Sequence, residues 1–210
     1  MSNGIKVKKR NGRGEESLNL DKMHLMVEEA TKGLAGVSAS QVEIQSGIQF
    51  YDGITTAEIQ EILIKSASDL IDLDHPNYQF VAARLLLFSI RKSLYGRTRE
   101  LPHLEDHIIK AVSQEVYDAG IYDKYSKEDI EKANGYIDHD RDFLFTFAGL
   151  RQVVDKYLVQ DRSTGQVYET PQFMYMMIAL TIFAEYPKQT RLNYVRRYYN
   201  AISKHKLNIP

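Results

Sequence analysis

The stretch KKRNGRGEESLNLDK, residues Lys8–Lys22, joins a turn signal to a helix start and sets how the fold begins. Its Asn11-Gly12 dipeptide is typical of a tight hairpin turn, so Ile5–Lys9 and Ser17–Leu18 are predicted to pair as a short β-hairpin. Asn19 fits the N-cap of a helix, because its side chain can accept a hydrogen bond from a backbone N–H of the first turn. The many cations leave two interpretations open: an exposed polar hairpin or a phosphate site.

Apolar residues beyond the hairpin recur at helical spacing and predict four helices within residues 1–96. The second helix is predicted over residues 40–50, with Ile44 and Ile48 on one face. The third begins at Thr55–Glu58, a T-x-x-E capping box in which each end residue bonds the backbone N–H of the other.

A second region is predicted to follow the fourth helix, which starts with Pro76 at its first position and ends near Gly96. Residues 97–210 are predicted to be helical, with one β-hairpin around Ser163–Gly165. The predicted fold is therefore mainly α. A domain over residues 1–96, made of a small β-hairpin plus four helices, precedes a helical segment over residues 97–210.

The composition excludes several classes of chemistry. Hydrophobic residues make up 43% of the 210 residues, enough for a buried core, and the net charge of −1 does not suggest a general nucleic-acid binder. The absence of cysteine removes disulfides, zinc ribbons, iron–sulfur clusters and thiol catalysis. The longest apolar run, Phe173–Ala184, is shorter than the ~18 residues of a membrane span, and no signal peptide is visible. We therefore expect a cytoplasmic protein with no membrane partner and a buried helix at this run.

Two segments rich in histidine and acid raise the question of a metal site. His103 and His107 are four residues apart and would share a helix face, as zinc ligands must, but no third ligand accompanies them. We interpret this segment as an exposed polar helix turn and expect no metal. The run Asp138–Asp142 is interpreted as a solvated helix start with Asp138 as its cap, because neighbouring side chains on a helix point in different directions.

The basic segment 187–210 is an alternative functional candidate, as a nucleic-acid-binding helix. It holds six Lys or Arg and no acid, together with Tyr194, Tyr198 and Tyr199. Cations hold phosphates and aromatic rings stack on bases. The competing interpretation is an amphipathic helix whose tyrosines pack inward and whose cations face water. We favour the second, because the whole chain is nearly neutral, and do not expect nucleic acid as a partner.

No catalytic motif is present. Neither a P-loop nor a dinucleotide-binding glycine pattern occurs, and the serine, histidine and carboxylate positions form no recognisable triad. A helix start at Thr55-Thr56 would offer backbone N–H groups and a positive dipole end to a phosphate. Lys9, Arg10 and Lys22 could supply cations. A nucleoside triphosphate site built from these parts is physically sensible, although basic hairpins and capped helices also occur without ligands.

Several separated segments together resemble a known family. Residues 7–22, 48–71 (IQFYDGITTAEIQEILIKSASDLI) and 76–96 (PNYQFVAARLLLFSIRKSLYG) resemble the ATP-cone of the class I ribonucleotide reductase large subunit. Residues 137–179 and 186–210 resemble the helical segment that leads into the catalytic barrel of that family. The resemblance covers essentially the whole chain.

The resemblance implies an allosteric switch, in which bound ATP turns the reductase on and bound dATP turns it off, each with Mg²⁺. Lys9 and Arg10 match a basic pair that contacts the nucleotide, and Glu16 matches an acid near the base. Gln60 stands where the family often has His, and glutamine can hydrogen-bond a ribose or phosphate but cannot become cationic. The full set of implied nucleotide-binding residues is Lys9, Arg10, Glu16, Asn19, Lys22, Thr56, Gln60 and Lys92.

The resemblance also implies partners. The family continues into a barrel with redox and radical cysteines, whereas this chain has no cysteine and should be inactive alone. The implied partners are the remaining catalytic part of the large subunit, either truncated away or a second polypeptide, and the reductase small subunit. ATP-cones also occur in zinc-ribbon transcriptional repressors, but the lack of cysteine and the helical segment 97–210 argue against that class.

Overall fold

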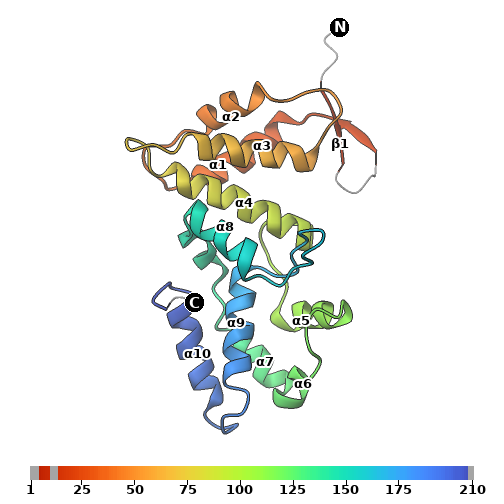
Figure 1. Ribbon diagram of the computed structural model, residues 1–210, viewed down its shortest axis with the longest axis vertical. Helices are drawn as coiled ribbons and strands as arrows, with labels where there is room; N and C mark the ends of the chain where they lie inside the picture. Colours follow the sequence, from red (N-terminus) through yellow and green to blue (C-terminus); the bar gives the residue numbers. More distant parts are fainter. Residues whose placement is uncertain (1–4, 10–13, 208–210) are drawn as a thin grey trace. The chain divides into compact units, whose positions relative to one another are not determined.

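The computed structural model consists mainly of α-helices and divides into two compact units. Figure 1 traces the order of the elements along the chain. Within the described residues, no helix combines the length and the hydrophobicity needed to cross a bilayer. The domain boundary predicted at residue 96 stays a prediction. The structure describes residues 5–9 and 14–207; the first unit comprises residues 1–89 and 145–151, and the second comprises residues 90–144 and 152–210.

The first unit contains a three-stranded sheet in the order β2-β1-β3. β1 (Lys6–Lys8) pairs antiparallel with β2 (Glu15–Ser17), which confirms the predicted hairpin, while its Asn11-Gly12 turn lies outside the described residues. β3 (Ile54–Thr55) pairs parallel with the other side of β1. β3 was not predicted, because two residues are too few to show an alternating pattern. The sheet brings the hairpin beside the segment that leads into α3 (Figure 1).

The helices of the first unit begin close to the predicted positions. The side chain of Asn19 caps α1, and Thr55 and Glu58 form both hydrogen bonds of the predicted capping box at the start of α3. Pro76 lies in the turn before α4 and not at its first position, so that part of the prediction was wrong. The helix bounds are Leu20–Thr31 for α1, Ala39–Gly47 for α2, Thr56–Asp69 for α3 and Tyr78–Tyr95 for α4. The part of α4 after residue 89 belongs to the second unit.

The inward face of α2 differs from the apolar face that the sequence suggests. Val42 and Ser46 are fully buried, whereas Ile44 and Ile48 are 69% and 83% exposed. Residues two apart on a helix lie about 200° apart around its axis, so burial of one pair turns the other to the surface. The two isoleucines do share a face, as predicted, but this face is open in the described structure.

The second unit is built around α9, the apolar helix predicted to be buried. Every residue of α9 from Pro171 to Met176 is buried, and α10 packs against the helix (Figure 1). The predicted β-hairpin is a single antiparallel bridge between Gln160 and Val167, and Gly165 adopts the positive φ of +73° in its turn. The helices that follow α4 in the chain are α5 (Leu104–Ser113), α6 (Ile121–Lys124), α7 (Lys127–Asn134), the 3₁₀-helix η1 (His139–Leu144), α8 (Phe147–Lys156), α9 (Pro171–Ile182) and α10 (Arg191–Ile202). All of them lie in the second unit except the part of α8 up to residue 151, which belongs to the first.

Two segments that were predicted to be solvated carry buried polar side chains. Asp142 is 1% exposed and forms an ion pair with Arg91, with 2.9 Å between Oδ2 and Nη2. His107 is also buried and stacks on Phe173 with 4.2 Å between ring centroids, so only His103 of its pair is exposed. The sequence interpretation was wrong at these positions, because the partner that makes each burial favourable is distant in the chain.

Candidate nucleotide-binding site

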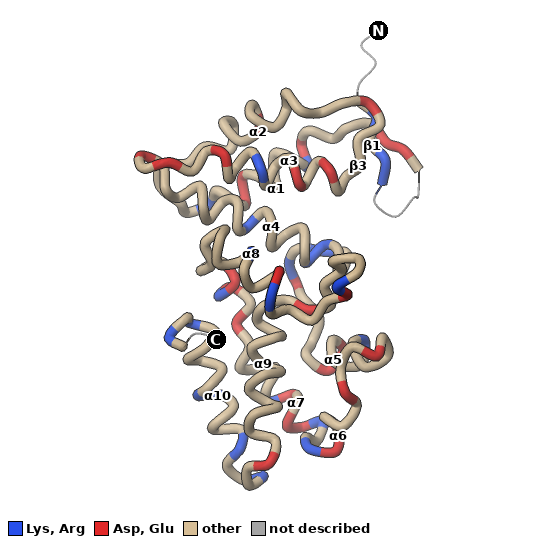
Figure 2. The backbone as a smooth tube through the Cα atoms, in the orientation of Figure 1, with Lys and Arg blue, Asp and Glu red and all other residues tan. Residues whose placement is uncertain are grey.

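Lys9 and Glu16 face each other across the β-hairpin. Lys9 directly follows β1, and its Nζ lies 3.1 Å from Oε2 of Glu16 in β2. The backbone N–H of Lys9 donates to the carbonyl of Gly14. The two side chains are 43% and 40% exposed, so water and solutes reach the ion pair. Figure 2 shows the charged residues along this hairpin. The pair therefore offers a cation to an incoming anion.

The start of α3 lies at the same edge of the sheet as Lys9. β1 and β3 run parallel, with Lys8 opposite Thr55, so the residues that follow each strand, Lys9 and Thr56, are brought to one edge. Thr56 is the first residue of α3 and is half-buried. A helix N-terminus beside a lysine suits an anionic group.

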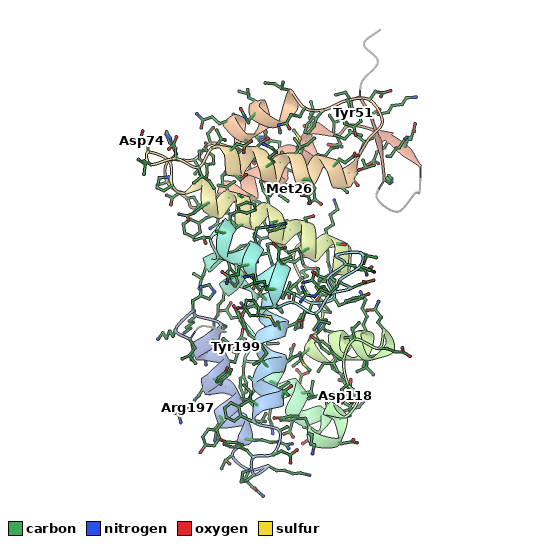
Figure 3. All side chains as sticks on the ribbon, in the orientation of Figure 1. Met26, Tyr51, Asp74, Asp118, Arg197 and Tyr199 are labelled. Atoms are coloured by element: carbon green, nitrogen blue, oxygen red, sulfur yellow. The ribbon has the colours of Figure 1, made fainter. Side chains whose placement is uncertain are left out.

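Glu58 fills part of the N-terminus of α3. Its carboxylate accepts hydrogen bonds from the backbone N–H of Thr55 at 2.8 Å, the Thr55 hydroxyl at 2.7 Å and the Tyr51 hydroxyl at 2.8 Å. The bonds from Thr55 lower the pKa of Glu58, and the nearby charge of Lys8 lowers it further. The sequence predicted the capping box, but it did not predict that Tyr51, labelled in Figure 3, and Lys8 also interact with Glu58. The helix start thus holds a carboxylate of its own.

Asn19 and Lys22 lie at the opposite end of the hairpin from Lys9. The backbone N–H of Leu18 donates to the carbonyl of Ile5 at 2.8 Å, which places the start of α1 beside the beginning of β1. The Oδ1 atom of Asn19 accepts a hydrogen bond from the backbone N–H of Lys22 at 2.9 Å, and the Lys22 side chain is exposed. The described hairpin therefore separates two groups of predicted residues, one at each end.

Gln60 is a buried residue of α3 whose side chain contacts α1. It is 5% exposed, and its Nε2 atom lies 3.6 Å from the sulfur of Met26, which is labelled in Figure 3. Burial disfavours a charged side chain, so a neutral amide suits this position better than an imidazolium would. The glutamine at this position is therefore matched to its surroundings.

Two predicted residues cannot be related to this geometry. Arg10 lies outside the described residues. Lys92 is exposed in the last turn of α4 and belongs to the second unit, which is described separately. Across residues 5–9 and 14–207, no three His, Asp or Glu side chains are grouped so that they could hold a metal ion.

The basic helix α10 fits the predicted inward packing only in part. Tyr199 is buried, but Tyr194 is 40% exposed and stacks on Phe183. Arg191 is buried and bonds Asp129 at 2.7 Å, so one of the expected surface cations serves the interior. The helix therefore uses part of its basic and aromatic character to hold the second unit together.

Comparison with known proteins identifies both parts of the chain. Residues 5–93 match the ATP cone domain, and residues 143–210 match the family described as ribonucleotide reductase, all-alpha domain. The chain therefore contains one segment that matches an ATP cone and another that matches the all-alpha domain of ribonucleotide reductase.

Its relatives are ribonucleoside-diphosphate reductase alpha subunits. The chain is 47% identical over all of its 210 residues to the alpha subunit of Haemophilus influenzae and to the reductase 1 alpha subunit of Escherichia coli K12. It is 41% identical over 177 residues, 83% of its length, to the alpha subunit of Enterobacteria phage T4. The matches cover 28%, 27% and 23% of these relatives, so the chain spans about a quarter of their length.

Proposed function

We propose that this chain is the activity-regulating N-terminal part of a ribonucleoside-diphosphate reductase large subunit. Its cone binds ATP, which activates the enzyme, or dATP, which inhibits it. The chain contributes to cytoplasmic deoxyribonucleotide synthesis together with the remaining catalytic part of the large subunit and with the small subunit. It does not reduce nucleotides alone, because it has no cysteine.

The observation that supports this proposal best is the position of Lys9, Glu16 and the start of α3 at one edge of the sheet, within the segment that matches the ATP cone. In our proposal the nucleotide extends along the hairpin from this edge toward Asn19 and Lys22. Mg²⁺ is held chiefly by the phosphates, as is usual for this ion, since the described residues hold no ready-made metal cluster.

The two effectors differ by one 2′-hydroxyl, so they act differently only if they bind two conformations with different affinities. A single neutral hydrogen bond contributes about 0.5–1.5 kcal/mol, which is a modest difference in affinity. We place the buried amide of Gln60 in the pocket, where it bonds the ribose or a phosphate. Unlike a histidine, this amide keeps its charge state across the physiological pH range.

Isothermal titration of the purified chain with Mg-ATP and then with Mg-dATP tests the proposal. Lys9→Ala should weaken both nucleotides by about tenfold or more, since a hydrogen bond between charged groups contributes about 1.5–3 kcal/mol. Thr56→Ala should also weaken both. Lys65→Ala is the matched control, because Lys65 is an exposed lysine of α3 that pairs with Asp69. Failure of the folded chain to bind either nucleotide, or equal effects of the two lysine substitutions, would contradict the proposal.

A further inference from the structure

The second unit contains an open cavity of about 530 Å³ that the proposed nucleotide function does not use. This volume lies within the range of roughly 300–1,000 Å³ that is usual for small-molecule sites. One wall comes from α9, and the others come from α6 with the segment that precedes it and from the segment between α8 and α9. The wall is mainly apolar, and its side chains include Val116, Ile121, Met174, Met177, Ile178 and Ile182.

A buried carboxylate, Glu169, lines this apolar cavity. Glu169 is 2% exposed; its Oε1 atom accepts the backbone N–H of Val159 at 2.7 Å, and its Oε2 atom accepts the hydroxyl of Tyr117. Among the described residues, no Lys, Arg or His lies within ion-pair distance of it, and burial raises the pKa of Glu169. A buried carboxylate without a counter-charge is costly, so this position favours either a proton or a cation.

The other polar groups around the cavity do not supply that cation. Lys124 lines the cavity but pairs with Glu185 at 2.6 Å. The Nε2 atom of His107 lies 3.2 Å from the hydroxyl oxygen of Tyr117. Burial lowers the pKa of this histidine to about 4, so it is neutral at pH 7. Asp118, labelled in Figure 3 on the segment between α5 and α6, adds a further acid to the lining. The cavity therefore combines an apolar wall with a buried carboxyl group that none of these neighbouring groups pairs as a cation.

We infer that this cavity is a binding site for a small molecule that has an apolar body and one ammonium group. The apolar body lies against the methionine and isoleucine side chains of α9, and the ammonium group faces Glu169 and Tyr117. The site lies entirely within the second unit and does not depend on nucleotide binding by the cone.

Methyl NMR of the full chain, labelled at its methionine methyl groups, tests the inference directly. The probes are n-hexylammonium, n-hexanol and hexanoate, which share an apolar body and differ in the head group. Hexylammonium should shift the Met174 and Met177 signals and leave Met23 and Met26 of the first unit unchanged. Its affinity should exceed that of hexanoate by about tenfold, the factor that corresponds to about 1.4 kcal/mol. The absence of shifts at Met174 and Met177, or equally tight binding of hexanoate, overturns the inference.

Substitutions then separate the charge from the cavity. Glu169→Gln should abolish the preference for hexylammonium over hexanol, whereas Met177→Trp should fill the cavity and weaken both probes. Glu128→Gln, an exposed acid in the first turn of α7, is the matched control and should change neither. If Glu169→Gln does not fold, titration of the unmodified chain replaces it, because protonation of Glu169 at acid pH should remove the same preference. A preference that survives both treatments refutes the assignment of Glu169.

Discussion

Replacing Asp142 with leucine should strongly destabilise the second unit, because it leaves a buried guanidinium without its counter-charge. The Arg91 side chain is 3% exposed and Asp142 is its ion-pair partner. Arg91 also donates to the carbonyl of His139 at 2.8 Å and to that of Thr98 at 3.3 Å, but these neutral acceptors do not compensate the charge. Removal of one member of a buried ion pair typically costs about 3–5 kcal/mol, a large share of the roughly 5–15 kcal/mol that stabilises a domain.

Urea unfolding, followed by far-ultraviolet circular dichroism, measures this effect as a double-mutant cycle. Asp142→Leu and Arg91→Met should each lower the free energy of unfolding by about 3–5 kcal/mol. The double variant should lose far less than their sum, because an apolar pair of similar volume often replaces a buried ion pair without a penalty. Asp69→Ala removes the exposed pair with Lys65 and should cost no more than about 0.5 kcal/mol.

Two results would refute this reasoning. Asp142→Leu could prove no more harmful than the exposed control Asp69→Ala, which would mean that the Arg91 charge is compensated by other groups. Alternatively, the double variant could lose the full sum of the single losses, which would mean that the two side chains act independently.

Three further outcomes follow from the structure. Thr55→Ala removes one side chain of the capping box and should cost about 1 kcal/mol in thermal unfolding; no change would mean that the box does not stabilise α3. Ile44→Lys should change the free energy of unfolding by less than about 0.5 kcal/mol, because Ile44 is 69% exposed, and a larger loss would show that α2 is turned the other way. Burial lowers the pKa of His107 and His139 from 6.5 to about 4. Between these values the unfolded chain binds protons that the folded chain does not, so stability is complete above pH 6.5 and falls toward pH 4, by up to about 3 kcal/mol for each histidine. Urea unfolding at pH 7, 5.5 and about 4 measures this loss of stability. His107→Gln should reduce the loss, and a free energy of unfolding that stays constant over this pH range would contradict the prediction.

The parts of the fold that were predictable depend on chemistry within a few residues. Asn19 bonds a backbone N–H three residues away, and Thr55 and Glu58 bond each other over the same separation. The signals for these caps therefore lie in the local sequence. The same holds for the β-hairpin, whose strands lie close together in the sequence.

The parts that were missed depend on contacts that are distant in sequence. The burial of Asp142 follows from Arg91, which is 51 residues away, and β3 exists because it pairs with β1. Local periodicity reveals neither the ion pair nor the strand pairing, because both depend on how distant parts of the chain pack together. The orientation of α2 was missed for a related reason: a nine-residue helix carries too few apolar residues to define one face, and packing selected Val42 over Ile44.

The contacts of Glu58 and Lys9 determine how the proposed nucleotide site attracts a phosphate. A helix N-terminus is a favourable place for an anion, but α3 presents Glu58, whose lowered pKa keeps it charged and whose bonds to Thr55 and Tyr51 hold it in place. Lys9 has a weaker attachment, since an exposed ion pair such as the one with Glu16 contributes only about 0–1 kcal/mol. A phosphate can therefore draw Lys9 away from Glu16 at little cost. Glu58, by contrast, stays at the helix start and repels the phosphate. The attraction in the proposed site comes from the hairpin, and the helix start contributes mainly the shape and polarity of the opposite wall.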